Sequence, residues 1–289
     1  MPYSFQSIYF DCNIVNGRVI DIFMPEKITR EKALFFVHGG GWQAGSRTDY
    51  HKLMRAFNER GFICAATDYR LNGVTILDQI TDVRHGYDLF MSVLAREGKA
   101  RKIFTYGSSA GAHLAALLTL TMPGECGEDV VYGEYFLKNA WLRPVGAALQ
   151  STPVVFEPWE DIFPPIWSAM QGIAGVPYEQ QPDSYRKLSP INHLSEQTPP
   201  IFFLEAENEH MFPLEHTVTF IARAKSYKCR AEYKLYPKTE HGFFYDVTRR
   251  QQKEAFSDIL SFIESLDSDG LKKVFYEPPE RRNAMNKER

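Results

Sequence analysis

The chain has 289 residues, of which 44% are hydrophobic and 24% are charged, and its formal net charge is −3. This composition is ordinary for a globular protein with a sizeable core, and the small acidic excess excludes the basic surface typical of nucleic-acid binding or a polybasic membrane contact. Four cysteines, Cys12, Cys64, Cys126 and Cys229, form no CxxC pair, which argues against a metal cluster or a redox motif.

The first predicted element is a β-hairpin close to the start of the chain. The runs SIYFDCNIV and RVIDIFM flank Asn16-Gly17, and both residues of this dipeptide readily take the positive φ that a tight hairpin turn needs. The preceding residues carry neither a positively charged segment nor a long apolar run. We therefore expect no signal peptide and no membrane-spanning segment, with the cytoplasm as the default location.

Six more apolar runs predict buried strands, and helical stretches separate them. The runs are ALFFVHGG, FICAATDYR, KIFTYGSS, PVGAALQST, PPIFFLEAE and AEYKLYP. The helical stretches cover roughly residues 49–60, 75–97, 110–120, 214–226 and 250–266. This alternation predicts an α/β fold, with a mostly parallel eight-stranded sheet, helices on both of its faces and the antiparallel hairpin leading into it.

Two regions depart from the alternation. Residues 153–190 are rich in proline and aromatic residues, so we interpret them as an insertion over the sheet, with one short helix near 166–173. Residues 267–289 form a charged tail that we expect to pack loosely or to stay disordered. The expected organisation is a single domain over residues 1–266 that contains the insertion, followed by this tail.

The segment FTYGSSAGAHLAALLTL predicts an abrupt change from strand to helix. Ser109 stands at the centre of the pattern G-x-S-x-G, with the small residues Gly107 and Gly111 on either side of a crowded turn. In a strand–turn–helix context this pattern is the nucleophile elbow of α/β-hydrolases, and the helix that follows favours negative charge near the serine. The alternative is a glycine-rich turn without chemistry, but the context favours a nucleophile.

A run of three glycines follows the strand ALFFV, in the sequence HGGGW. Consecutive glycines let backbone N–H groups face a ligand without an obstructing Cβ, and such donors stabilise the oxyanion that forms during ester hydrolysis. We predict an oxyanion hole made by the N–H groups of Gly40, Gly41 and Ala110. A phosphate-binding loop is the alternative, but the Gly-Lys-Ser/Thr that it requires does not follow Trp42.

The predicted general base is His241, one of eight histidines. It comes just beyond the last predicted strand, in YPKTEHGFFYD, and loops at the carboxyl ends of parallel strands carry the functional groups of such sheets. His38 precedes the glycine run and is expected to hold that loop by hydrogen bonds. His113, on the helix after Ser109, is expected to pack rather than react.

The acid that orients the base is expected after the penultimate strand, in PPIFFLEAENEHMFPLEH. Glu205, Glu207 and Glu209 all lie there, and we choose Glu209, with Glu207 as the alternative. The chain order serine, Glu209, His241 is the order expected of an α/β-hydrolase. The three carboxylates could instead form a solvated acidic rim or a weak cation site, but nothing else has ligand spacing, so we expect no metal.

Five motifs, in order, cover roughly residues 33–266: FFVHGGGWQAGS, DYRL, YGSSAGAHLAALL, LSPINHLSEQTPPIFFLEAENEHMFP and EHGFF. Together they resemble the α/β-hydrolase esterases of the hormone-sensitive-lipase-like type, close to the bacterial carbohydrate-esterase and feruloyl-esterase-like branch. The resemblance implies a two-step acyl-enzyme mechanism, no cofactor and the same oxyanion donors. Such enzymes usually carry an aspartate in an HGxxD loop, where this chain has Glu209 in place of the aspartate and Glu205 in place of the histidine.

The predicted substrate is a small-molecule carboxylic ester with a short acyl group, and an acetylated sugar is the preferred candidate by analogy with the family. Trp42, Trp159 and Trp167 are the candidate pocket residues, because aromatic faces stack on sugar rings and on aryl groups. No long lid helix is evident, which disfavours a long-chain lipase.

Two other functions stay open on the sequence alone. The first is an amide hydrolase of the arylformamidase-like or small-peptidase type, which would use the same triad. The second is a non-catalytic binding protein with the same fold, although such a protein would be expected to have lost the serine or the histidine. We expect neither a nucleic-acid nor a membrane partner, and the sequence does not define an oligomeric state.

Overall fold

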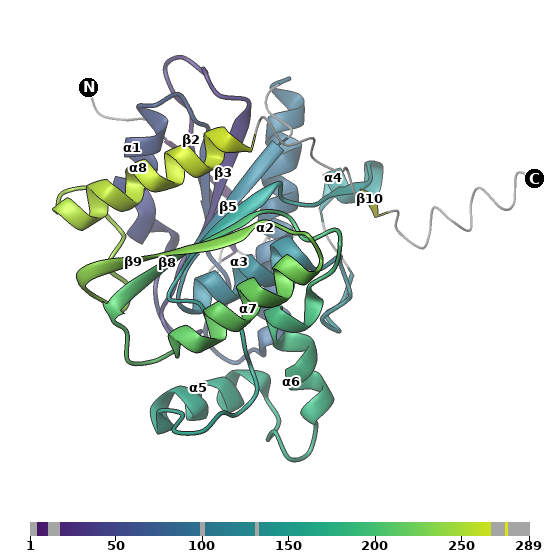
Figure 1. The fold of residues 1–289 in the computed structure, drawn as a ribbon. Helices are drawn as coiled ribbons and strands as arrows, with labels where there is room; N and C mark the ends of the chain where they lie inside the picture. The colour runs from purple at the N-terminus through teal and green to yellow at the C-terminus, as the bar shows by residue number, and fades with distance from the viewer. Residues whose placement is uncertain (1–4, 11–17, 99–101, 131–132, 267–274, 277–289) are drawn as a thin grey trace, which may run out of the picture.

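A sheet of eight strands forms the centre of the protein (Figure 1). The computed structural model describes residues 5–10, 18–98, 102–130, 133–266 and 275–276. The strands of this sheet are β1 (Phe5–Tyr9), β2 (Val19–Phe23), β3 (Lys32–Val37), β4 (Cys64–Thr67), β5 (Lys102–Ser108), β7 (Gly146–Gln150), β8 (Ile201–Asn208) and β9 (Ala231–Glu240). Their spatial order is β1-β2-β4-β3-β5-β7-β8-β9.

The pairing within the sheet is mostly parallel. From β4 to β9 every neighbouring pair is parallel, whereas β1 with β2 and β2 with β4 are antiparallel. The predicted mostly parallel sheet with an N-terminal antiparallel hairpin is therefore confirmed. The turn predicted at Asn16-Gly17 lies outside the described residues.

Helices cover both faces of the sheet (Figure 1). The helices are α1 (His51–Asn58), α2 (Ile76–Arg96), α3 (Ala110–Leu120), α4 (Glu134–Lys138), α5 (Pro164–Ala174), α6 (Pro182–Leu188), α7 (Leu214–Ser226) and α8 (Arg250–Ser265), with 3₁₀ turns η1 (Arg47–Tyr50) and η2 (Pro190–His193). Apolar residues of α1 and α8 form the core on one face, and those of α2, α3 and α7 form the core on the other. No helix of the described residues combines the length and the hydropathy that crossing a bilayer requires.

The strand sequences are nearly continuous apolar runs because the sheet is buried on both faces. In β3, Phe35 and Val37 belong to one core, while Leu34 and Phe36 belong to the other. All eleven residues of α3 are buried, which explains why this helix is built almost entirely from alanine and leucine. The carboxyl end of β5 and the start of α3 thus meet in a packed environment that fixes the turn between them.

The proline-rich insertion folds into two short helices rather than the single one predicted. Helices α5 and α6 each begin with proline in the first turn, where its fixed φ suits a helix and its missing N–H costs nothing. Both lie together at one end of the molecule (Figure 1). Of the predicted tail, the structure describes Phe275–Tyr276, the strand β10, which pairs with β6 (Trp141–Leu142) in a separate two-stranded sheet.

Candidate active site

Ser109 forms the tight turn between β5 and α3. Its backbone has φ 55° and ψ −125°, a conformation that residues with a side chain rarely adopt. A Cβ on Gly107 would lie 2.3 Å from the carbonyl oxygen of Gly111, so the flanking residues have no room for a side chain. Ser109 is partly exposed, whereas the neighbouring Ser108 is fully buried. The turn therefore presents the side chain of Ser109 and hides that of Ser108.

The glycine loop packs directly against this turn. A Cβ on Gly39 would lie 2.6 Å from the carbonyl oxygen of Ser108, and one on Gly111 would lie 2.3 Å from the carbonyl oxygen of His38. Residues of the loop and of the elbow are thus in backbone contact. Ala110 is the first residue of α3, so its N–H has no partner within the helix.

The two predicted oxyanion glycines adopt positive φ, 120° at Gly40 and 59° at Gly41. At Gly40 a Cβ would also lie 2.2 Å from the carbonyl oxygen of Ala44, whereas at Gly41 the space is open and the backbone conformation alone favours glycine. The Gly40 carbonyl accepts hydrogen bonds from the N–H groups of Gln43 and Ala44, at 3.1 and 2.9 Å. These bonds fix the loop in one conformation.

His38 holds the base of this loop. Its Nδ1 lies 2.9 Å from the carbonyl oxygen of Gly39, and its ring stacks on Tyr69 at a centroid distance of 4.2 Å. The Tyr69 hydroxyl in turn donates to the His38 carbonyl oxygen at 2.8 Å. Burial lowers the pKa of His38, so the neutral ring is favoured and Nδ1–H can donate to Gly39.

His241 and Glu209 form a hydrogen-bonded pair across two loops. The histidine Nδ1 is 2.9 Å from both carboxylate oxygens, and the Oε1 of Glu209 also accepts from the N–H of Met211 at 2.9 Å. Burial would raise the pKa of Glu209, but the hydrogen bonds and charge of His241, with the bond from Met211, bring that pKa below its ordinary value. An ionised carboxylate that accepts from Nδ1–H leaves Nε2 as the basic nitrogen of the ring.

The structure brings His241 and Glu209 together, but no hydrogen bond joins either of them to Ser109 within the described residues. Catalytic hydrogen bonds of unliganded hydrolases are often long and tighten only when substrate is bound. The side chain of His241 is 21% exposed and that of Glu209 only 6%. The ring therefore remains accessible to a reactant, while its carboxylate partner is shielded.

The other two glutamates of the cluster have separate partners. Glu205 is buried and accepts a hydrogen bond from the hydroxyl of Thr217 at 2.8 Å; burial raises the pKa of Glu205 to about 7. Glu207 is exposed and accepts from the N–H of Lys238 at 2.7 Å. No group of three potential metal ligands occurs among the described residues.

Replacing Glu205 by glutamine is expected to stabilise the fold at pH 8 and to change little at pH 4. The pKa of Glu205 is about 7 in the folded protein against an ordinary 4.5, so folded-state stability is lost as the pH rises between those values. The raised pKa corresponds to about 3 kcal/mol of folding free energy that is lost once the buried carboxyl group ionises. Glutamine carries no charge, so the variant does not lose this free energy, and its amide oxygen can still accept from the Thr217 hydroxyl. Urea unfolding of both proteins at the two pH values measures this, and an equal difference at both would contradict it.

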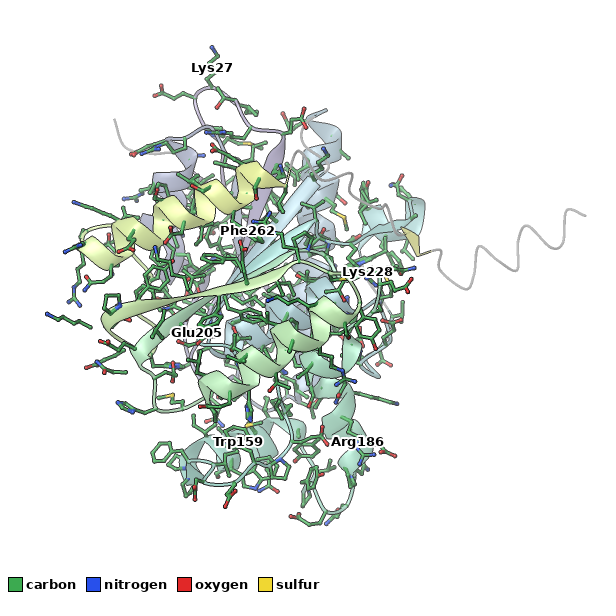
Figure 2. All side chains as sticks on the ribbon, in the orientation of Figure 1. Lys27, Trp159, Arg186, Glu205, Lys228 and Phe262 are labelled. Carbon is green, nitrogen blue, oxygen red and sulfur yellow. The ribbon has the colours of Figure 1, made fainter. Side chains whose placement is uncertain are left out.

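The three tryptophans predicted for the pocket lie in different surroundings. Trp42 is 1% exposed and packs edge-on against His113 and Phe156, so its ring supports the glycine loop from inside and offers a ligand almost no surface. Trp159 and Trp167 are half-buried in the insertion; Figure 2 shows Trp159 at the end of the molecule where α5 lies. These two remain the candidates for the pocket.

An aromatic row that the sequence reasoning missed connects the insertion to His241. Phe212 lies 5.8 Å from the His241 ring and 6.4 Å from Trp159, and the His216 ring is perpendicular to Trp159 at 5.1 Å, all as centroid distances. Phe212 follows the predicted acid by three residues, which is the signal that could have identified it. The row places Trp159 on the histidine side of the site.

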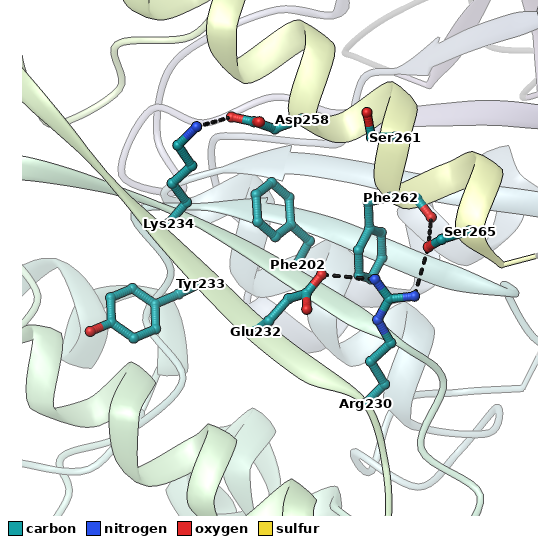
Figure 3. Close-up of a pocket in the computed structure, with 9 residues that line it drawn as sticks. All are labelled: Phe202, Arg230, Glu232, Tyr233, Lys234, Asp258, Ser261, Phe262 and Ser265. Carbon is teal, nitrogen blue, oxygen red and sulfur yellow. Dashed lines mark hydrogen bonds and ion pairs between the residues drawn. The ribbon is translucent and has the colours of Figure 1, made fainter.

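A separate hollow of about 390 Å³ lies between β9 and α8 (Figure 3). Its cationic groups are already paired, Arg230 with Glu232 at 2.9 Å and Lys234 with Asp258 at 2.8 Å. None of the predicted site residues lines it. Its residues are Phe202, Arg230, Glu232, Tyr233, Lys234, Asp258, Ser261, Phe262 and Ser265.

Comparison with known families gives two matches. Residues 20–223 match the family described as BD-FAE, and residues 182–266 match the dienelactone hydrolase family. The two matches overlap and together extend from β2 to the end of α8.

Among curated proteins, the chain is 28% identical to the Arabidopsis thaliana isoprenylcysteine alpha-carbonyl methylesterase ICME, over 91% of this chain and 63% of that protein. It is also 28% identical to the esterase LipQ of Mycobacterium tuberculosis, over 81% of this chain and 56% of that protein. The chain thus spans less than two thirds of the length of these relatives. Among solved structures, esterase 2 of Thermogutta terrifontis superposes with a TM-score of 0.70 at 20% identity, covering 92% of this chain and 96% of that one.

Proposed function

This chain belongs to the BD-FAE family, among the α/β-hydrolase esterases of the hormone-sensitive-lipase-like type, and we propose that it is a serine hydrolase of carboxylic esters. The observation that carries the proposal is the turn at Ser109, where a partly exposed serine with positive φ starts α3 beside the glycine loop. A hydrogen-bonded histidine and carboxylate on neighbouring loops supply a base with Nε2 available. A turn with only a structural role would require neither the exposed serine nor the histidine–carboxylate pair.

In the proposed reaction, Nε2 of His241 takes the proton of Ser109 as Oγ attacks the ester carbonyl. The N–H groups of Gly40, Gly41 and Ala110 stabilise the oxyanion, which is the largest single contribution in many such sites. His241 then returns the proton to the departing alcohol, leaving an acyl-serine. Water, deprotonated by the same histidine, releases the acid and restores Ser109, while Glu209 stabilises the charged imidazole throughout.

We propose an ester with a short acyl group as the substrate, and an acetylated carbohydrate as its first candidate. The Thermogutta terrifontis esterase 2 has been solved with propionate and with butyrate bound, whereas the plant relative is named as a methylesterase, for which the small group is the alcohol. Trp159, half-buried on the histidine side of the site, is the aromatic side chain on which a sugar ring can stack. The bound propionate and butyrate support a compact acyl side, and Trp159 supports a sugar on the alcohol side.

The protein is expected to hydrolyse p-nitrophenyl acetate and butyrate with a kcat/KM at least about tenfold above that for the octanoate. Initial rates on the three esters measure this, with acetate release from an acetylated xylo-oligosaccharide assayed in parallel. Preference for octanoate would contradict the short-acyl proposal. Turnover of an aryl formamide in the absence of ester hydrolysis would replace the esterase proposal by the amide-hydrolase alternative.

A further inference from the structure

Gln150 is a buried amide at the carboxyl end of β7, in the middle of the sheet. It is fully buried and belongs to neither the proposed triad nor the proposed oxyanion hole. A buried amide left without partners is costly, so its contacts show what it holds in place.

The side chain of Gln150 binds the loop that carries the histidine. Its oxygen accepts from the backbone N–H groups of Phe243 and Phe244, at 2.6 and 3.0 Å. The opposite orientation of the amide would set its NH₂ group against those two donors, so hydrogen-bond complementarity selects this one. The NH₂ group then donates to the hydroxyl of Tyr106 at 2.9 Å and to Oγ of Ser108 at 3.3 Å.

The main chain of the same residue binds the nucleophile. The N–H of Ser109 donates to the Gln150 carbonyl oxygen at 2.9 Å. The Tyr106 hydroxyl completes the set by donating to the carbonyl oxygen of Phe244 at 2.9 Å. One residue of β7 therefore holds the backbone of Ser109 through its carbonyl and the loop two residues beyond His241 through its side chain.

We propose that Gln150 is a positioning residue that sets the place of His241 relative to Ser109. The inference rests on the proposed serine-hydrolase function, because it assigns Gln150 a role in that reaction. Glu209 controls the orientation and charge of the histidine ring, whereas Gln150 joins the loop after that ring to the backbone of the nucleophile. The hydrogen bonds of Gln150 thereby set the distance between base and nucleophile, and small errors in that distance are costly for proton transfer.

The variant Gln150→Met keeps the length of the side chain and removes its hydrogen bonds. We expect kcat for p-nitrophenyl acetate to fall about 100-fold with KM within about threefold, because binding of the ester does not depend on the position of the base. Gln150→Glu keeps an acceptor for Phe243 and Phe244 and is expected to retain at least about tenfold more kcat than the methionine variant. Thermal unfolding of each variant establishes that it is folded.

Asn58→Leu is the matched control. Asn58 is another buried amide, which donates to the carbonyl oxygens of Phe23 and Phe62 at 3.1 Å each and has no contact with the site. It is expected to lower stability and to leave kcat unchanged. An equal loss of kcat in Asn58→Leu and Gln150→Met would overturn the proposal in favour of a general effect of losing a buried amide.

A folded Gln150→Met enzyme with wild-type kcat would also overturn the positioning role. The proposed function would stand in that case, because the wild type would still hydrolyse the ester. Wild-type protein without activity on any ester would remove the proposed function and the positioning role with it. If Gln150→Met does not fold, Tyr106→Phe decides. It removes the hydroxyl that accepts from the Gln150 amide and donates to the Phe244 carbonyl oxygen, and it leaves the bonds from Phe243 and Phe244 to the Gln150 oxygen in place. A kcat loss of a few fold at constant KM supports the proposal, whereas an unchanged kcat rejects it.

Discussion

Ser109→Ala is expected to lower kcat for p-nitrophenyl acetate by about four to six orders of magnitude. The proposed acyl-enzyme forms on Oγ of this residue, and no other hydroxyl stands at the start of α3 with the same exposure. The turn is retained, since alanine has the same backbone preferences as serine at this point, so the melting temperature should stay within a few degrees. Steady-state kinetics and thermal unfolding on the same preparations measure both effects.

The matched control is Ser226→Ala, which removes the hydroxyl of an exposed serine at the far end of α7. It should keep full activity. Labelling by a fluorophosphonate provides a second measurement, with the expected mass increase on the peptide that contains Ser109 and none in Ser109→Ala. Residual activity above about one percent in that variant would contradict the assignment of the nucleophile.

Glu209→Gln is expected to reduce kcat by about 10⁴-fold, as loss of the triad carboxylate does in related chemistry. Glutamine can donate to Nδ1, which favours the tautomer with its proton on Nε2 and so removes the base. The pKa of Glu209 lies below its ordinary value, so the carboxylate is ionised over the whole range in which an esterase assay is practical. A pH profile of kcat/KM should therefore show no titration of Glu209 above pH 5.

Glu207→Gln is the control for that variant, since Glu207 lies two residues away and its carboxylate accepts from Lys238 instead. It is expected to retain activity within about twofold of wild type. A large loss in Glu207→Gln, together with near-normal activity in Glu209→Gln, would transfer the role of the acid to Glu207.

Most of the sheet and several helices could be predicted because local signals agree with the fold. The predicted stretches 110–120 and 214–226 coincide with α3 and α7, which begin after a strained serine and after Pro213 respectively. The stretch predicted as one helix over 49–60 is divided into η1, which begins at a capping box on Ser46, and α1. Helix α6 was missed, since its seven residues are too short for a clear periodicity.

In the candidate site, too, residues within local motifs could be predicted and those defined by long-range contacts could not. Ser109, His241 and the glycine loop could be singled out because each follows a predicted strand within a short motif. Gln150 could not, because a polar residue at the end of an apolar run looks like the surface end of a strand. Its burial depends on the loop after β9 folding back over it, which is a contact between segments far apart in the sequence. The burial of the Trp42 ring has a similar cause, since the ring packs against His113 of α3 and Phe156 of the insertion, which are far from it in the sequence.

The backbone of Ser109 also bears on how such a site can be lost. A serine held at φ 55° costs on the order of 1–3 kcal/mol relative to an unstrained residue, and glycine at the same position would avoid that cost. Selection for thermal robustness alone would therefore favour glycine at position 109 and an inert protein. Stabilising this chain by random substitution and heat challenge, without an activity screen, would accordingly allow Ser109→Gly to be selected.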